Sequence, residues 1–278
     1  MMEPLTSLQN PRAKRAVRLR DRRARDREEC FIIEGYREIL RAVESGLPID
    51  EIFFCPTLYL GENESKLVAT AVENCHANAF ETSEGVFRKI SYRDRPDGLL
   101  AIAMKPNWGL DRLEANDSES PLILVAQAIE KPGNLGTLLR TCDGAGVTGV
   151  MVVDRCTDIF NPNVVRASVG TLFTVPVVEV SSEEAARWLD EKQIRTVATS
   201  PNAETEYSVA DLSGPLALVV GSEQYGLDEF WLSKTDTLVK ISMAGAADSL
   251  NVAVANAVVL FEVVRQRQSK RIAADLDS

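Results

Sequence analysis

The chain has 278 residues, of which 45% are hydrophobic and 26% are charged, and its formal net charge is −10. This length and composition are typical of a globular protein with room for two domains, and they exclude a fibrous or wholly disordered chain. No apolar run is long enough to cross a bilayer, and the basic stretch near the amino terminus is not followed by the apolar segment that a secretion signal needs. We therefore expect a cytoplasmic protein without membrane contact.

The cysteines and the single histidine narrow the possible chemistry. The five cysteines are widely spaced and form no Cys-x-x-Cys pair, which argues against a disulfide framework and against zinc. We expect reduced, mostly buried thiols and no bound metal. The histidine, His76, stands beside Cys75 far from the later motifs, which disfavours a Ser-His or Cys-His hydrolase because that chemistry needs an imidazole near its nucleophile.

Residues 12–27 carry a dense run of arginine and lysine that is interrupted by only two acidic residues, Asp21 and Asp26. Clustered basic side chains bind phosphate backbones, so this run is a candidate RNA contact despite the acidic chain. The predicted contacts are Arg12, Lys14, Arg15, Arg18 and Arg22. A solvated helix face or a disordered arm explains the run equally well.

The stretch after this run alternates between strand and helix patterns. Strands are predicted at residues 30–34, 49–55 and 98–104, and helices at 36–45, 66–75 and 86–90. Residues 105–121 have little periodicity and several turn-forming residues, which is typical of a linker. We therefore predict a first α/β domain at residues 1–107, a linker at 108–120 and a second domain at 121–278.

The second domain has longer apolar runs, alternating with helical patterns. Strands are predicted at residues 122–129, 149–153, 175–180, 196–199, 216–220 and 238–241, and helices at 135–143, 163–169, 182–191, 228–233 and 249–267. Apolar runs without polar interruptions suit parallel strands that are covered on both faces. The pattern predicts a doubly wound α/β sheet.

Residues 144–149 fit the Gly-x-Gly-x-x-Gly pattern of dinucleotide-binding folds. In those folds the glycines follow a strand and open a helix. Here they close a predicted helix and lead into a strand, which is the position of a glycine helix stop. This order removes the main support for a nicotinamide-dependent oxidoreductase.

Three polar segments, at residues 130–140, 220–227 and 241–252, each begin where a strand-like run ends. Loops at the carboxyl ends of parallel strands are where open α/β sheets bind ligands, so the three can converge on one polar small molecule. Asn134 is predicted to cap the helix that follows it, and Asp248 or Ser249 to cap the last helix. Taken alone, helix caps, a surface arginine and a solvated glutamate explain these residues as well.

Together and in this order, the three segments resemble the signature motifs of the SpoU (TrmH-type) RNA ribose 2′-O-methyltransferases, members of the SPOUT class that use S-adenosylmethionine. The likeness covers roughly residues 121 to 268, and the preceding stretch resembles the small L30e-like substrate-binding domain of that family. The resemblance implies a parallel-sheet SPOUT fold with a carboxyl-terminal trefoil knot, a homodimer and a structured RNA substrate. We expect ribosomal RNA of the 23S type. Transfer RNA, or a non-catalytic RNA-binding protein on the same scaffold, is the alternative.

The resemblance also implies roles for individual residues. It assigns catalysis to Asn134, Arg140, Glu223, Ser249 and Asn251, and cofactor binding to Thr199, Gly221, Ile241, Met243, Ser249, Leu250 and Asn251. Two positions depart from the family pattern: Gln224 replaces a glycine and Ser242 replaces a proline.

Arg140 leaves two roles open, because a ribose hydroxyl must lose or share its proton as the methyl bond forms. A guanidinium is normally too basic to accept that proton. Arg140 is therefore either a strongly perturbed base or a phosphate clamp that orients the hydroxyl, and we favour the clamp.

Overall fold

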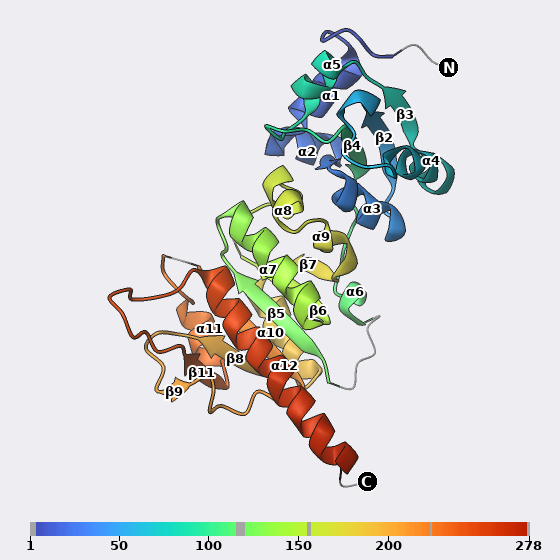
Figure 1. Ribbon diagram of the computed structural model, residues 1–278. Coiled ribbons are helices and arrows are strands. Elements are labelled where there is room, and N and C mark those ends of the chain that lie inside the picture. The colour runs from blue at the N-terminus through green and yellow to red at the C-terminus, as the bar shows by residue number, and fades with distance from the viewer. Residues whose placement is uncertain (1–3, 115–119, 155–156, 223, 277–278) are drawn as a thin grey trace. The chain divides into compact units, whose positions relative to one another are not determined.

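Two sheets organise this protein in a computed structural model that describes residues 4–114, 120–154, 157–222 and 224–276 (Figure 1). The contacts divide the chain into two units. The first contains residues up to 107 together with 158–174, and the second contains 108–157 and the residues from 175 onward. The described cysteines, which are Cys30, Cys55, Cys75 and Cys142, are free thiols. Cys156 lies outside the described residues.

The first unit is built on a four-stranded sheet in the order β1-β4-β2-β3. Its strands are β1 (Cys30–Glu34), β2 (Ile49–Phe54), β3 (Asn78–Glu81) and β4 (Leu99–Met104). Strand β4 pairs antiparallel with β1 and β2, while β2 and β3 are parallel. The helices are α1 (Pro11–Arg18), α2 (Arg22–Glu28), α3 (Tyr36–Glu44), α4 (Glu64–Cys75) and α5 (Glu84–Ile90), with a 3₁₀ turn η1 (Pro56–Leu58). The predicted strands at 30–34, 49–55 and 98–104 are therefore confirmed to within a residue.

The basic run forms two helices that pack into the first unit. The side chain of Asn10 caps α1 and that of Asp21 caps α2, each by accepting a backbone N–H of the first turn. Small residues between the arginines, such as Ala13 and Ala16, are buried against Phe87 and Ile90 of α5. The run is therefore an ordered helix pair, and a disordered arm is excluded.

Helices α8 (Pro162–Ala167) and α9 (Thr171–Thr174) lie between two strands of the second sheet in sequence, but they belong to the first unit. The ring of Phe160, just before α8, packs on Phe31 of β1 with centroids 4.5 Å apart. Gly170 lies so close to α3 that a Cβ there would be 2.9 Å from the Cα of Glu38. The predicted domain bounds follow chain order, so they did not place this segment.

The second unit contains a seven-stranded sheet in the order β7-β6-β5-β10-β8-β11-β9. Every neighbouring pair is parallel, which confirms the predicted parallel α/β sheet. The strands are β5 (Leu122–Gln127), β6 (Gly149–Val153), β7 (Val177–Val180), β8 (Arg195–Thr199), β9 (Thr205–Glu206), β10 (Leu216–Val220) and β11 (Thr237–Lys240). The helices are α6 (Asp111–Glu114), α7 (Pro132–Ala145), α10 (Ser182–Glu191), α11 (Glu229–Lys234) and α12 (Val252–Leu276).

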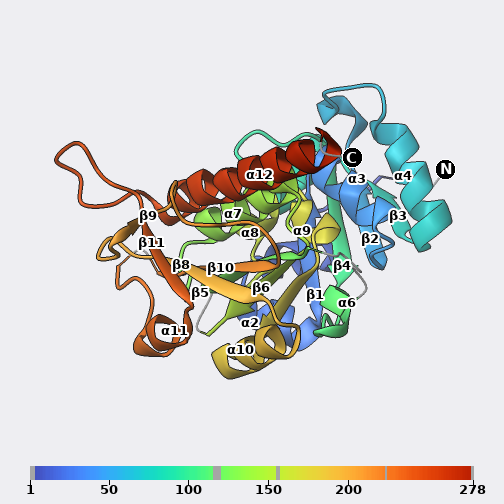
Figure 2. The same cartoon turned by 90° about the horizontal axis from the view of Figure 1, so that it is seen from below.

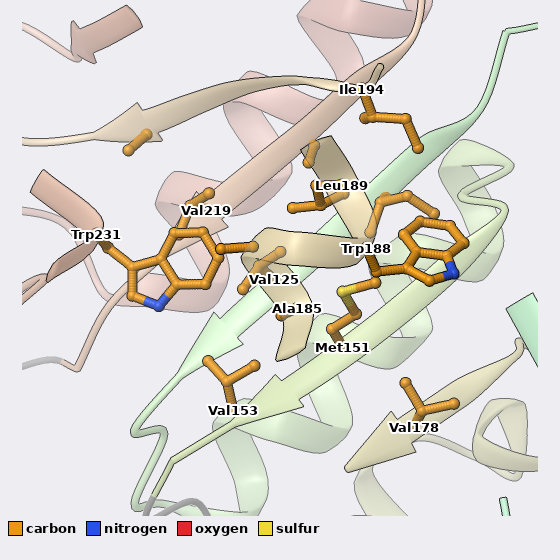
Figure 3. Close-up of a cluster of buried hydrophobic side chains, with 14 of the residues drawn as sticks. Val125, Met151, Val153, Val178, Ala185, Trp188, Leu189, Ile194, Val219 and Trp231 are labelled. Atoms are coloured by element: carbon orange, nitrogen blue, oxygen red, sulfur yellow. The ribbon is translucent and has the colours of Figure 1, made fainter. Parts of the chain in front are cut away.

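Helices cover both faces of this sheet, with α7 and α12 on one side and α10 and α11 on the other (Figure 2). The central strand β10 is fully buried along its length, as its uninterrupted apolar sequence requires. On the α10 side, Val125, Met151 and Val219 from three strands pack with Trp188 and Trp231 (Figure 3). Within the part of the chain that the structure describes, no helix has both the length and the apolar character needed to cross a bilayer.

Candidate active site

One cavity lies at the carboxyl ends of β8, β10 and β11, which are neighbours in the sheet. Parallel neighbours end at the same edge, so the loops after Thr199, Val220 and Lys240 meet there. The cavity has a volume of about 640 Å³. Predicted cofactor residues on its wall are Thr199, Gly221, Ile241, Met243, Ser249 and Leu250. The seventh, Asn251, does not line it.

The loop after β10 is held closed by its own backbone. The N–H of Ser222 donates to the carbonyl of Gly226 and the N–H of Gly226 donates to the carbonyl of Ser222, both at 3.0 Å. Gly226 has a φ of +68°, and a Cβ on Gly221 would overlap the carbonyl group of Gly226. Both positions therefore require glycine. Glu223, the predicted catalytic glutamate of this loop, lies outside the described residues.

The loop after β11 is tied to the sheet at Ser242. Its hydroxyl and its N–H both donate to the carboxylate of Glu206 on β9. Ser242 stands where the family pattern has a proline. Hydrogen bonds to Glu206 therefore hold the loop at the position where the family has a rigid proline ring. From Ala244 to Ser249 the loop is exposed.

The helix caps in the two asparagine-containing motifs differ from the prediction. Helix α12 is capped by Asn251, whose Oδ1 accepts the N–H of Ala253 at 2.9 Å, so the predicted cap at Asp248 or Ser249 is wrong. Asn134 is not a cap either, because α7 begins two residues earlier, at Pro132. A proline is well placed at the start of a helix, since it lacks the N–H that would remain unpaired there.

The first and third motifs meet through their asparagines. The Nδ2 of Asn251 donates to the Oδ1 of Asn134 at 3.3 Å, across 117 positions of sequence. This contact joins the amino-terminal ends of α7 and α12, where unpaired backbone N–H groups favour negatively charged or polar ligands.

Arg140 lies further along α7, exposed, and no carboxylate among the described residues forms an ion pair with it. It does not line the cavity. Two of the five predicted catalytic residues, Asn134 and Asn251, are thus in contact, and Ser249 lies on the cavity wall.

The cavity also has polar walls that the sequence prediction missed. Ser200, Asn202, Ser222, Gln224 and Asp248 line it, and so does the exposed Tyr225. Each lies within three positions of a residue that was predicted, so the signal was the position of the strand end. A loop that closes on a ligand presents several consecutive residues to it.

Most of the predicted RNA contacts already have acidic partners. Arg12 pairs with Glu51, Arg15 with Asp50 at 2.6 Å, and Arg18 with Glu28 at 3.4 Å. Arg22 lies 3.6 Å from Asp26, and the Lys105 ammonium beside that same carboxyl holds the pKa of Asp26 below its ordinary value. Lys14 is exposed and has no ion pair within the described ranges.

Comparison with known proteins decides which of the alternatives applies. Residues 121–261 match the SpoU rRNA Methylase family, and residues 10–101 match the MRM3-like substrate binding domain. The chain belongs to the SpoU rRNA Methylase family. It is 31% identical over 263 residues to the 23S rRNA (uridine(2479)-2′-O)-methyltransferase of Streptomyces viridochromogenes, covering 92% of this chain and 89% of that protein.

Two further relatives show the same organisation. The 23S rRNA (guanosine(2553)-2′-O)-methyltransferase RlmP of Bacillus subtilis is 28% identical over 262 residues, which cover 94% of this chain and 99% of the relative. The crystal structure of an S-adenosylmethionine-bound rRNA methyltransferase from Sinorhizobium meliloti superposes with a TM-score of 0.85 at 30% identity, covering 95% of this chain and 97% of that one.

These findings confirm the predicted family, the α/β fold with its parallel SPOUT-type sheet, the use of S-adenosylmethionine and the class of RNA ribose methyltransferase. Residues of the second and third motifs line the cavity. The trefoil knot, the homodimer and the roles of individual residues stay predictions.

Proposed function

We propose that this SpoU family member transfers a methyl group from S-adenosylmethionine to a ribose 2′-hydroxyl of 23S-type ribosomal RNA in the cytoplasm. The observation that carries the proposal is that the second and third motif loops line one cavity, while the Asn134–Asn251 contact joins the first motif to the third. Relatives that match nearly the whole chain are named for 23S rRNA, and they modify different nucleosides. The kind of RNA is therefore better supported than the nucleotide.

The residues around the cavity suit the proposed cofactor. Its volume of about 640 Å³ falls in the range of roughly 300–1,000 Å³ that small-molecule sites occupy. Gly221 leaves backbone groups open to a close ligand, and Ile241, Met243 and Leu250 supply apolar surface for an adenine. Thr199 and Ser249 offer hydroxyl groups. When bound, S-adenosylmethionine supplies an activated methyl group on a sulfonium sulfur.

The catalytic residues would position the ribose and steady charge as its hydroxyl reacts. Asn134 and Asn251 restrain each other, which keeps their remaining amide groups in fixed directions for a substrate. Ser249 lies on the cavity wall, where its hydroxyl can bond cofactor or ribose. Glu223 is proposed to accept a hydrogen bond from a loop amide or from the ribose.

Arg140 is proposed as a clamp on a backbone phosphate of the RNA. An exposed guanidinium without a carboxylate partner among the described residues keeps its planar fork available for phosphate oxygens. Because Arg140 does not line the cavity of its own chain, we propose that it serves a cofactor bound largely by a second subunit.

A homodimer is proposed on the apolar surface of α12. Val254 and Phe261 are 50% and 51% exposed, and they are seven positions apart, so they lie on the same face of the helix. Such a face is suited to a symmetric contact between two copies.

The segment at residues 10–101 is proposed to hold the RNA. Lys14 is the most available of the predicted contacts, whereas Arg12, Arg15, Arg18 and Arg22 would have to exchange or share their carboxylate partners. Transfer RNA is the second candidate substrate.

Labelled S-adenosylmethionine and an unmodified 23S rRNA transcript test the proposal. We expect label in the RNA, at a ribose that resists alkaline cleavage. Parallel reactions use transfer RNA as the alternative substrate, or unlabelled cofactor as the background control. A wild-type chain that binds the cofactor in calorimetry but labels neither RNA would reject enzymatic function, and label in transfer RNA alone would replace the substrate.

A further inference from the structure

Tyr225 is the most exposed aromatic side chain in the part of the chain that the structure describes. Its side chain is 77% exposed, and the next is Phe261 at 51% on α12. Tyr225 lines the cavity formed by the loops after β8, β10 and β11, whereas Phe261 does not. The ring makes no aromatic contact and its hydroxyl has no hydrogen-bond partner among the described residues. Packing within this chain therefore does not account for an aromatic residue here.

The backbone beneath Tyr225 is fixed on both sides. Its own N–H donates to the hydroxyl of Ser222 at 3.1 Å, and the Ser222–Gly226 backbone pair closes the loop around it. On the following side, the carboxylate of Asp228 accepts the N–H of Trp231, which is fully buried. A solvated ring on an anchored loop is presented outward at little further cost in backbone entropy.

The proposed reaction brings a partner for that ring, namely a base of the RNA. Proteins that recognise unpaired RNA stack its bases on exposed aromatic side chains, and the interaction tolerates any base because each has a π-face. A ribose whose 2′-hydroxyl reaches the methyl donor carries its own base to the rim of the cavity. We propose that Tyr225 is a substrate-positioning residue whose ring stacks on the base of the methylated nucleotide. This inference rests on the proposed function.

Two other roles for Tyr225 predict different results when the side chain is removed. If Tyr225 covered the cofactor, its removal would weaken S-adenosylmethionine binding without RNA. If it lay in a contact between two copies, its removal would change the assembly. A ring at 77% exposure encloses little of the cavity, and the cavity already has apolar walls at Ile241, Met243 and Leu250, which favours the base.

The test measures kcat and KM for an unmodified 23S rRNA transcript with labelled S-adenosylmethionine. We expect Tyr225→Ala to raise the KM for RNA roughly tenfold while kcat stays within about twofold, because a stacked base is lost on binding. Tyr225→Phe keeps the ring and stays within about twofold of wild type. Tyr225→Leu keeps apolar bulk but no π-face, and behaves like Tyr225→Ala. Val209→Ala is the matched control, since Val209 is 76% exposed in the same unit and does not line the cavity.

Cofactor affinity by calorimetry and mass by sedimentation are measured on the same variants. Unchanged values together with the KM effect support stacking. A loss of cofactor affinity, a change of assembly, or a KM within twofold of wild type for Tyr225→Ala overturns it.

A second measurement separates the base from the rest of the RNA. Once the methylated nucleotide is mapped, a short RNA with an abasic site at that position keeps the ribose and removes the base. Wild type and Tyr225→Ala should then show equal KM values, and a persisting difference overturns stacking on that base. A wild-type chain that labels no RNA overturns the proposed function itself, whereas active wild type with a normal Tyr225→Ala overturns only this inference.

Discussion

The basic helices of the first unit and the cavity loops of the second unit handle charge in opposite ways. In α1 and α2, neighbouring carboxylates neutralise most of the arginines, and Arg25 is buried against Asp158 at 2.6 Å. The loops around the cavity instead present mostly uncharged polar side chains, with Asp248 as the one carboxylate among the lining residues described, and Arg140 on α7 has no ion pair among the described residues. The region dense in positive charge thus uses much of it for folding, while Arg140 in the second unit stays available.

The density of charged residues along a chain is therefore a poor measure of the charge that is available to a ligand. An arginine already bonded to a carboxylate must give up that partner before it can bind phosphate, and the exchange gains little. A guanidinium without a carboxylate partner gives up only bound water when it binds phosphate.

Arg140→Ala should lower kcat for RNA methylation by about 10²–10³-fold, because a positioned cation that steadies developing charge contributes on that scale. Cofactor affinity should be unchanged, since Arg140 does not line the cavity. Arg140→Lys keeps a point charge but loses the planar fork, so its kcat should lie between those of wild type and Arg140→Ala. Equal activity of wild type and Arg140→Ala would remove the clamp from the mechanism.

Arg25→Ala should destabilise the fold by about 3 kcal/mol, because it leaves the carboxylate of Asp158 buried without its partner. The guanidinium also donates to the carbonyls of Leu19 and Arg20, which lose a donor. Arg22→Ala is the matched control, because its pair with Asp26 is exposed and worth about 1 kcal/mol or less. Urea unfolding measures the loss of stability in both variants. Equal shifts of the two unfolding midpoints would contradict the prediction.

Gly221→Ala should weaken S-adenosylmethionine binding about tenfold or more, since the added Cβ would overlap the carbonyl group of Gly226 and force the loop open. Gly245→Ala, in the loop after β11, meets nothing within 4 Å and should bind normally. Calorimetry without RNA compares them. Normal binding by Gly221→Ala would show that the loop geometry does not hold the cofactor.

Lys14→Ala should weaken RNA binding a few-fold and reduce the salt dependence of log K by about one, as the loss of one phosphate contact does. Arg18→Ala should have a smaller effect, because Arg18 already pairs with Glu28. Filter binding of the 23S transcript across a salt series distinguishes the two. A larger effect from Arg18 would contradict the idea that ion pairs withhold these arginines from RNA.

The smallest effect concerns Glu34 in the first unit. Burial raises the pKa of its carboxyl, outweighing the hydrogen bonds that it accepts from Ser91 and Tyr92. A raised pKa means that the folded chain holds the proton more tightly than the unfolded chain. This contribution to stability is therefore present below the ordinary pKa of 4.5 and is lost as pH rises through the raised value. Glu34→Gln should flatten the pH dependence of the unfolding free energy over that window, and an unaltered slope would contradict the assignment.

Much of the second unit could be predicted because its signals are local. A strand buried on both faces needs an apolar run such as Leu216–Val220, and a loop that follows it needs residues like Gly221 that permit close backbone contacts. The predicted cofactor residues Thr199, Gly221, Ile241 and Leu250 lie at one edge because parallel neighbours end together. The residue types and their order were therefore enough to locate the cavity.

Other features depended on contacts between distant parts of the chain. The apolar runs of the sequence were enough for the parallel sheet, and the resemblance of three motif segments to a known family implied the family and the cofactor, because strands and motifs consist of consecutive residues. Only the tertiary structure decided that Asn251 bonds Asn134, that α8 and α9 join the first unit, and that arginines 12, 15, 18 and 25 pair with carboxylates. A charge or a polar group has its effect through its neighbours in space, and these neighbours come from segments up to 133 positions away.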